Sequence, residues 1–117
     1  MAIVKNTLNN IVLHFTSNAN LAVVGNSSIS NIAYGNSTVY QNVSGASIRK
    51  IACSSNSATG TWTVKRGANV VWIASGNFLW DFAGHNMVLN QDAIANVAVE
   101  LTGGTGAILI QLSKESV

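Results

Sequence analysis

The sequence predicts an all-β fold, an antiparallel two-sheet sandwich or jelly roll of about eight to ten short strands. Apolar and polar residues alternate over short stretches, which is the pattern of strands that bury one face. Gly, Asn and Ser residues interrupt these stretches at intervals of roughly 8 to 12 residues, a spacing typical of sandwiches and barrels. A chain of 117 residues is also long enough to build one hydrophobic core. We therefore expect a single domain over residues 1–117.

The N-terminal third contains one clear strand pattern and several short ones. Residues 1–6 are expected to be either an arm that ties subunits together or a frayed end. In the segment IVLHF, Ile11, Leu13 and Phe15 share one face and His14 points to the other.

The segments LAVV, SISNIA and STVY are shorter strand candidates. Residues 25–29 are echoed at 35–39, with a poorer third copy at 43–48. A solenoid needs at least three stacked repeats, so we interpret the echo as similar turn–strand units.

The middle of the chain, residues 60–82, contains all three tryptophans and predicts a three-strand meander. Residues 61–66, 69–74 and 78–82 each alternate, and glycine-containing turns separate them. Arg66 stands at a strand end and does not need to be buried. The residues expected to share a face are Trp62, Val64 and Arg66 in the first strand, Val70, Trp72 and Ala74 in the second, and Phe78, Trp80 and Phe82 in the third.

The C-terminal third predicts two more strands around a glycine-rich turn at 102–106. Val97, Val99 and Leu101 form one apolar face, and a return strand over 107–112 forms the next with Ile108, Ile110 and Leu112. The glycines are not a phosphate-binding loop, because such a loop leads into a helix and here an Ile/Leu run follows. Only residues 90–96 are suited to a helical turn.

Charge is scarce along the whole chain. Charged residues make up 9% of the sequence, against about 25% in ordinary globular proteins, and the net charge is +2. Asn, Ser and Thr take their place, which supplies hydrogen bonds but little of the repulsion that keeps molecules apart. The six basic residues are scattered. This composition favours self-assembly and argues against nucleic acid as a partner, because a phosphate-binding surface needs converging Lys and Arg.

Membrane insertion and secretion are not expected either. The longest apolar runs, such as VVWIA and AILI, are far shorter than the roughly 20 residues of a membrane-spanning helix. The first residues do not have the pattern of a signal peptide. The single cysteine, Cys53, excludes an internal disulfide and is expected to behave as a small buried apolar residue.

Catalytic chemistry has few candidate residues. The two histidines are His14 and His85, and the spacing of Cys53, His85 and Asp81 does not indicate a nucleophile–base–acid site. His14 is expected to face solvent or an interface, and His85 to lie in a loop. Two histidines without adjacent carboxylates make a poor zinc site. We therefore predict a protein that is not an enzyme and needs no cofactor or metal.

The three tryptophans, Trp62, Trp72 and Trp80, allow two interpretations. They could form an exposed platform that stacks on sugar rings, or each could fill the core or a subunit interface. Burial is favoured, because each ring buries of the order of 150 to 250 Å² and exposing three would cost several kcal/mol. Trp62 and Trp72 are also expected to meet across a hairpin.

Three stretches together span most of the chain: IVLHFTSNANLAVVGNSSISNIA, GTWTVKRGANVVW and VAVELTGGTGAILIQLSK. In these stretches the chain resembles small all-β virion structural proteins of tailed phages, particularly marine ones. Members of that family resemble decoration or accessory proteins of the particle. The resemblance implies a place on the capsid surface after assembly in the bacterial cytoplasm. It implies no particular site residue.

Composition and resemblance together favour a structural protein that decorates and stabilises the capsid as a homo-oligomer, with a trimer favoured. Its partners would be the major capsid protein or other virion proteins. Two alternatives remain open: a glycan-binding module of the virion surface or tail fibre that uses an exposed tryptophan face, and an adaptor domain of the tail or neck.

Overall fold

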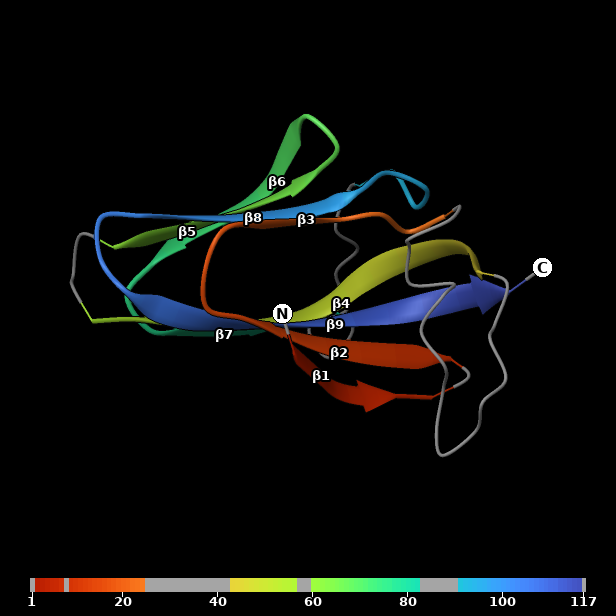
Figure 1. The fold of residues 1–117 in the computed structure, drawn as a ribbon, viewed down its shortest axis with the longest axis horizontal. Coiled ribbons are helices and arrows are strands. Elements are labelled where there is room, and N and C mark those ends of the chain that lie inside the picture. The colour runs from red at the N-terminus through yellow and green to blue at the C-terminus, as the bar shows by residue number, and fades with distance from the viewer. Residues whose placement is uncertain (1, 8, 25–42, 57–59, 83–90, 117) are drawn as a thin grey trace.

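The computed structural model describes residues 2–7, 9–24, 43–56, 60–82 and 91–116, which form nine strands in two antiparallel sheets (Figure 1). The five-stranded sheet has the order β1-β2-β9-β4-β7, and the four-stranded sheet has the order β3-β8-β5-β6. The two sheets lie one above the other in Figure 1. The predicted all-β two-sheet fold is therefore confirmed. The strands are β1 (Ala2–Asn6), β2 (Asn10–Phe15), β3 (Ala19–Leu21), β4 (Val43–Ser55), β5 (Thr61–Arg66), β6 (Asn69–Ser75), β7 (Phe78–Asp81), β8 (Val97–Thr102) and β9 (Gly106–Ser116).

The strand pairing is that of a jelly roll. The pairs β2–β9, β3–β8, β4–β7 and β5–β6 match each strand from β2 to β5 with one from β6 to β9, in reverse order, and β1 is added beside β2. The chain thus forms one long hairpin with its tip between β5 and β6, and the hairpin is rolled so that successive pairs alternate between the sheets. Among the described strands, only β1–β2 and β5–β6 are sequence neighbours in the same sheet.

This topology corrects two predicted connections. The expected meander of residues 61–82 is wrong at its last step, because β7 pairs with β4 of the other sheet instead of with β6. The strands expected to return on each other at 102–106 are also separated, since β8 pairs with β3 and β5 while β9 pairs with β2 and β4. In both places a short glycine-containing turn joins one sheet to the other. Local turn residues do not distinguish such a link from a hairpin within a sheet.

The predicted alternation holds for the strands that build the core. Each apolar face forecast for β2, β8 and β9 lies between the sheets, and Leu101 alone is only partly buried. The buried members are Ile11, Leu13, Phe15, Val97, Val99, Ile108, Ile110 and Leu112. Cys53 is buried as expected, as a free thiol.

The face predicted for β6 is wrong at Val70. Trp72 lies opposite Val64, but the next residue of β5, Lys65, lies opposite Val70, so Val71 is the extra residue of a β-bulge. A bulge shifts the alternation by one position. Val70 is therefore exposed, whereas Val71 and Trp72 pack against the core.

The N-terminal residues form the edge strand β1. Ile3 pairs with Leu13 of β2, and the buried Lys114 of β9 donates a hydrogen bond to the side chain of Asn6. The two repeat units at 25–29 and 35–39, and the strand candidates near them, lie outside the described residues. The third unit, 43–48, belongs to β4.

A buried arginine joins the two sheets at one end of the sandwich. Arg66, at the end of β5, is 1% exposed, although its position at a strand end did not require burial. Its guanidinium donates five hydrogen bonds of 2.6 to 3.2 Å to Ala46 of β4 and to Gln91, Ala93 and Ala95 of the segment before β8. These bonds use all five N–H donors of an arginine. The side chain is thus a structural link and has no donor left for a ligand.

The segment 91–96, which contains a turn and no helix, is fixed against β4 by the same group of contacts. The side-chain amide of Gln91 accepts a hydrogen bond from the backbone N–H of Ile48 and donates one to its carbonyl, as a neighbouring strand would. The backbone N–H of Ala46 donates to the carbonyl of Ala93 at 2.9 Å. Burial lowers the pKa of Arg66, and the carboxylate of Asp92 partly opposes this shift.

We expect Arg66→Met to destabilise the fold by about 3 kcal/mol or more, because it leaves several buried carbonyls without a donor. Arg66→Lys should fall between this variant and the native chain, since an ammonium has fewer donors. Urea unfolding followed by tryptophan fluorescence measures the difference. The control is Lys65→Met, which breaks a partly exposed ion pair and should cost less than about 1 kcal/mol. Equal losses for Arg66→Met and Lys65→Met would contradict the role of Arg66.

Candidate docking surface on the five-stranded sheet

The three predicted site tryptophans do not lie on one surface. Trp62 is fully buried in the core, and its indole N–H donates to the carbonyl of Ser54 at 3.0 Å. Ala74, and not Trp72, lies opposite it in β6. Trp62 therefore cannot stack on a sugar ring. Trp72 and Trp80 are partly buried and pack against the core.

An aromatic ladder joins the two sheets where β6 leads into β7. Trp72 of the four-stranded sheet contacts Phe78 edge-on, with ring centroids 5.9 Å apart. From Phe78 the ladder continues along one face to Trp80 and Phe82 at 6.2 and 6.4 Å. The shared face predicted for these last three rings is thus present. The ladder therefore covers the edge of the core where β6 leads into β7. Phe78 is 45% exposed, so part of its ring is accessible to solvent.

The outer face of the five-stranded sheet carries a row of mainly apolar residues, which we call the apolar row. His14 of β2, Leu109 of β9, Ala52 of β4 and Leu79 of β7 lie directly opposite one another in turn. Leu79 is 71% exposed and Leu109 is 39% exposed. Two shallow depressions, of about 240 and 160 Å³, both have Ala52 and Leu109 in their walls. The small side chain of Ala52 lies between the two leucines.

A second row beside it carries three charged residues, and we call it the charged row; Arg49, which donates a hydrogen bond to Ser113 at 3.0 Å, and Glu115 lie further along the same face. Lys5 of β1 lies opposite Val12 of β2, and the row continues through Gln111 and Lys50 to Asp81 of β7. Lys50 and Asp81 form a partly exposed ion pair of 3.4 Å. The face therefore has a lysine at its β1 edge and a carboxylate at its β7 edge.

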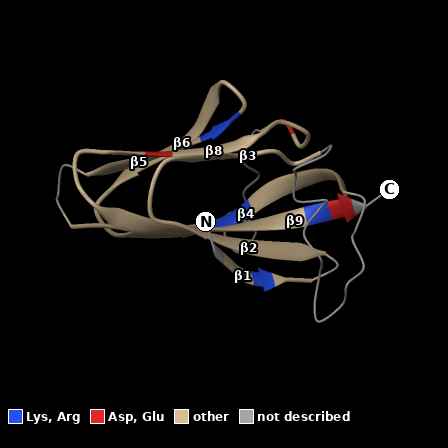
Figure 2. Cartoon of the chain, in the orientation of Figure 1, with Lys and Arg blue, Asp and Glu red and all other residues tan. Residues whose placement is uncertain are grey.

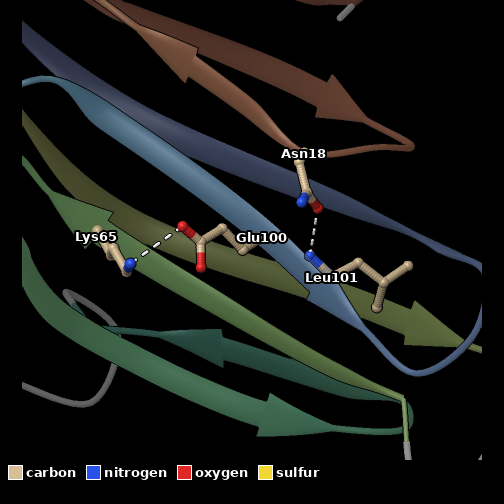
Figure 3. A network of polar contacts seen from close by, with 4 residues as sticks. All are labelled: Asn18, Lys65, Glu100 and Leu101. Atoms are coloured by element: carbon tan, nitrogen blue, oxygen red, sulfur yellow. Dashed lines mark hydrogen bonds and ion pairs between the residues drawn. The ribbon is translucent and has the colours of Figure 1, made fainter.

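The outer face of the four-stranded sheet has a different character. Lys65 and Glu100 form an ion pair of 3.0 Å across β5 and β8, and the side chain of Asn18 accepts a hydrogen bond from the backbone N–H of Leu101 at 2.7 Å (Figure 3). A depression of about 460 Å³ on this face is lined by Lys65, Glu100 and Asn18 among others. Ile73 is an exposed apolar residue here, opposite Thr63. Val70, opposite Lys65, is exposed on this face as well, so each outer face carries both charged and apolar residues.

Sequence reasoning missed the apolar row. Its signal was present in the segment AILI, where Leu109 breaks the alternation by placing an apolar residue on the outward side of β9. The same holds for Leu79 between Phe78 and Trp80. A contiguous exposed apolar patch marks a contact surface more often than a single exposed residue does. We therefore take the outer face of the five-stranded sheet as the candidate functional site.

The candidate catalytic and metal-binding residues from the sequence are described only in part. Among the described residues, no three His, Cys, Asp or Glu side chains lie close enough to hold a metal ion. Cys53 points toward the core side of β4, whereas Asp81 lies in the charged row on the outer face, so these two do not share a site. His85 lies outside the described residues. His14 belongs to the outer apolar row, partly exposed, as predicted.

No helix of the described residues has the length and apolar character needed to cross a membrane. No protein-family model, curated protein or solved structure matches the chain.

The reactivity of the Cys53 thiol tests which side chains of β4 face the core and which face solvent. Burial raises the pKa of Cys53, and its sulfur lies 3.8 Å from the carbonyl oxygen of Gly76. We expect native Cys53 to react with iodoacetamide at pH 8 at least about tenfold more slowly than the urea-unfolded chain. The matched control is Cys53→Ser/Ser54→Cys, which moves the thiol to an exposed neighbour. Equal rates for the two native proteins would contradict the assigned faces of β4.

Proposed function

We propose that the chain is a non-enzymatic structural protein of a phage particle, which decorates the capsid shell as an oligomer and stabilises it. The observation that carries the proposal is the apolar row, which is exposed on a chain with very little charge (Figure 2). Leu79 and Leu109 leave apolar surface in water that contact with a second copy or with a shell protein would remove, at a gain of about 25 cal/mol per Å². The resemblance to small virion proteins of tailed phages supports the same class of function.

The fold supports this proposal by analogy. Jelly rolls occur in viral capsid proteins, in lectins and in cupins. A fold shared by such different proteins does not define a function, which has to be argued from the site. Here the described residues offer a contact surface, and the guanidinium of Arg66 is engaged in structural bonds.

Stabilisation would act through mass action. A protein that binds the assembled shell but not its loose subunits shifts the equilibrium toward the shell by RT ln(1 + [L]/Kd). An oligomer binds several neighbouring capsid subunits at once, so weak single contacts add up to tight attachment. The partner in this mechanism is the major capsid protein.

Glycan binding is the second candidate, because Phe78 is 45% exposed between Trp72 and Trp80. A sugar ring could stack on this end of the aromatic ladder. An adaptor domain of the tail or neck would use the same docking chemistry as a capsid protein at lower copy number.

The decisive experiment separates phage particles from free protein on a density gradient and quantifies this chain by mass spectrometry. We expect it to travel with the particles, at a copy number on the order of hundreds, as the symmetry of a shell requires. A few copies per particle would favour the tail or neck adaptor. A chain found only in the free fraction would refute the proposal.

Titration with host polysaccharide tests the glycan alternative. Binding at the aromatic ladder should change the fluorescence of Trp72 and Trp80, and Phe78→Ala should abolish the change. A decoration protein without glycan affinity should show no change in either form.

A further inference from the structure

We propose that the outer face of the five-stranded sheet packs against the same face of a second copy of this chain. The two copies are related by a two-fold axis that lies between the two faces and runs parallel to β9. This inference names the self-contact of the oligomer and rests on the function proposed above. In this arrangement the apolar row forms the contact between the two copies. The capsid would then be contacted by other parts of the molecule.

The strand order makes β9 the natural position of the axis. β9 is the middle strand of the five, with β1 and β2 on one side and β4 and β7 on the other. Rotation about an axis along β9 places β2 over β4 and β1 over β7 of the second copy. Leu109 then faces Leu109 of the second copy, because both lie on the axis. The apolar row meets itself over its whole length.

Side-chain sizes match in this arrangement. The rotation sets His14 of each copy over Ala52 of the other. Ala52 lies in both depressions of the face, of about 240 and 160 Å³, between the larger Leu79 and Leu109. The imidazole of His14 therefore lies over the depression at Ala52 of the other copy and not over a leucine side chain.

The charges favour the same axis. Lys5 lies at the β1 edge of the charged row and Asp81 at the β7 edge, so the rotation sets Lys5 of each copy beside Asp81 of the other. Each ion pair between Lys50 and Asp81 would gain a second lysine. A two-fold axis across the strands would instead place β1 over β1, and Lys5 would not meet Asp81. The contact between Lys5 and Asp81 thus favours the axis along β9, while Glu115, exposed on the outward side of β9, would lie opposite its own copy at the end of the strand.

The face is large enough for a weak but specific dimer. Five strands spaced by about 4.8 Å are about 24 Å wide, and the six residues of β2 extend over about 20 Å. The projected area is therefore about 500 Å² on each copy, or about 1,000 Å² for the pair. This total meets the lower limit of about 1,000 Å² for specific interfaces, and we expect a dimer whose formation depends on concentration.

A crosslink across the axis is the most direct test. In a Cys53→Ser background, Leu109→Cys places a thiol opposite the same thiol of the second copy, with the two backbones about 10 Å apart. A short bismaleimide crosslinker should therefore convert most of the protein into a covalent dimer. Gln111→Cys, also on the outward side of β9, gives a second position should Leu109→Cys disturb the fold. The control is Ile73→Cys on the outer face of the four-stranded sheet, which should stay monomeric in a denaturing gel.

Charge reversal tests the edge contacts. Lys5→Glu should weaken the dimer about tenfold in sedimentation equilibrium, since both symmetric contacts become repulsive. Adding Asp81→Lys should restore much of the affinity. Far-UV circular dichroism of each variant checks that the fold is retained.

Three results would overturn the pairing: a monomer at all concentrations, a trimer, or crosslinking of Ile73→Cys as complete as that of Leu109→Cys. The trimer is the state that the sequence analysis favours. None of these results depends on whether the chain travels with phage particles. Failure of the pairing and failure of the proposed function are therefore distinguishable.

Discussion

The guanidinium of Arg66 is the interaction on which the arrangement of the two sheets depends. It leaves the four-stranded sheet at the end of β5 and reaches a carbonyl of β4 in the five-stranded sheet, together with the segment that leads into β8. A buried guanidinium is costly unless each of its donors has an acceptor. Here the five donors have acceptors, and Gln91 extends the network to Ile48. This network fixes one end of the sandwich, as the aromatic ladder fixes the link between β6 and β7.

A sandwich closed in this way presents two different outer faces. The interior takes the alternating apolar residues together with Arg66 and Lys114, and the other charges of the described residues are few and scattered (Figure 2). The four-stranded sheet uses its outer face for Lys65, Glu100 and a polar depression. The five-stranded sheet shows Leu79 and Leu109 to solvent beside a row that contains Lys5, Lys50 and Asp81. The exposed leucines of this face are the apolar surface that association would remove.

The sequence predicted the fold class and the core well, but not the connections or the site. The period of two in β2, β8 and β9 follows from burial of one strand face, which is a local property. Whether β7 pairs with β6 or with β4 depends on how the long hairpin is rolled. The residues of the turn between β6 and β7 are compatible with either pairing. The bulge at Val71 and the burial of Arg66 were missed for the same reason, since both depend on partners distant in the sequence. Leu109 and Leu79 were read as strand residues without a role, because their shared row forms only when β9, β4 and β7 lie side by side.

The claim that the outer face of the five-stranded sheet is the contact surface is tested most directly by hydroxyl-radical footprinting of the purified chain over a range of concentrations, and of the same chain bound to particles. Leu79, Leu109 and Ile73 all have exposed side chains in the single chain, so they serve as reporters of the two faces. The account predicts that oxidation of Leu79 and Leu109 falls as the chain associates, while oxidation of Ile73 does not change. Constant labelling of both leucines, in concentrated solution and on the particle, would contradict it.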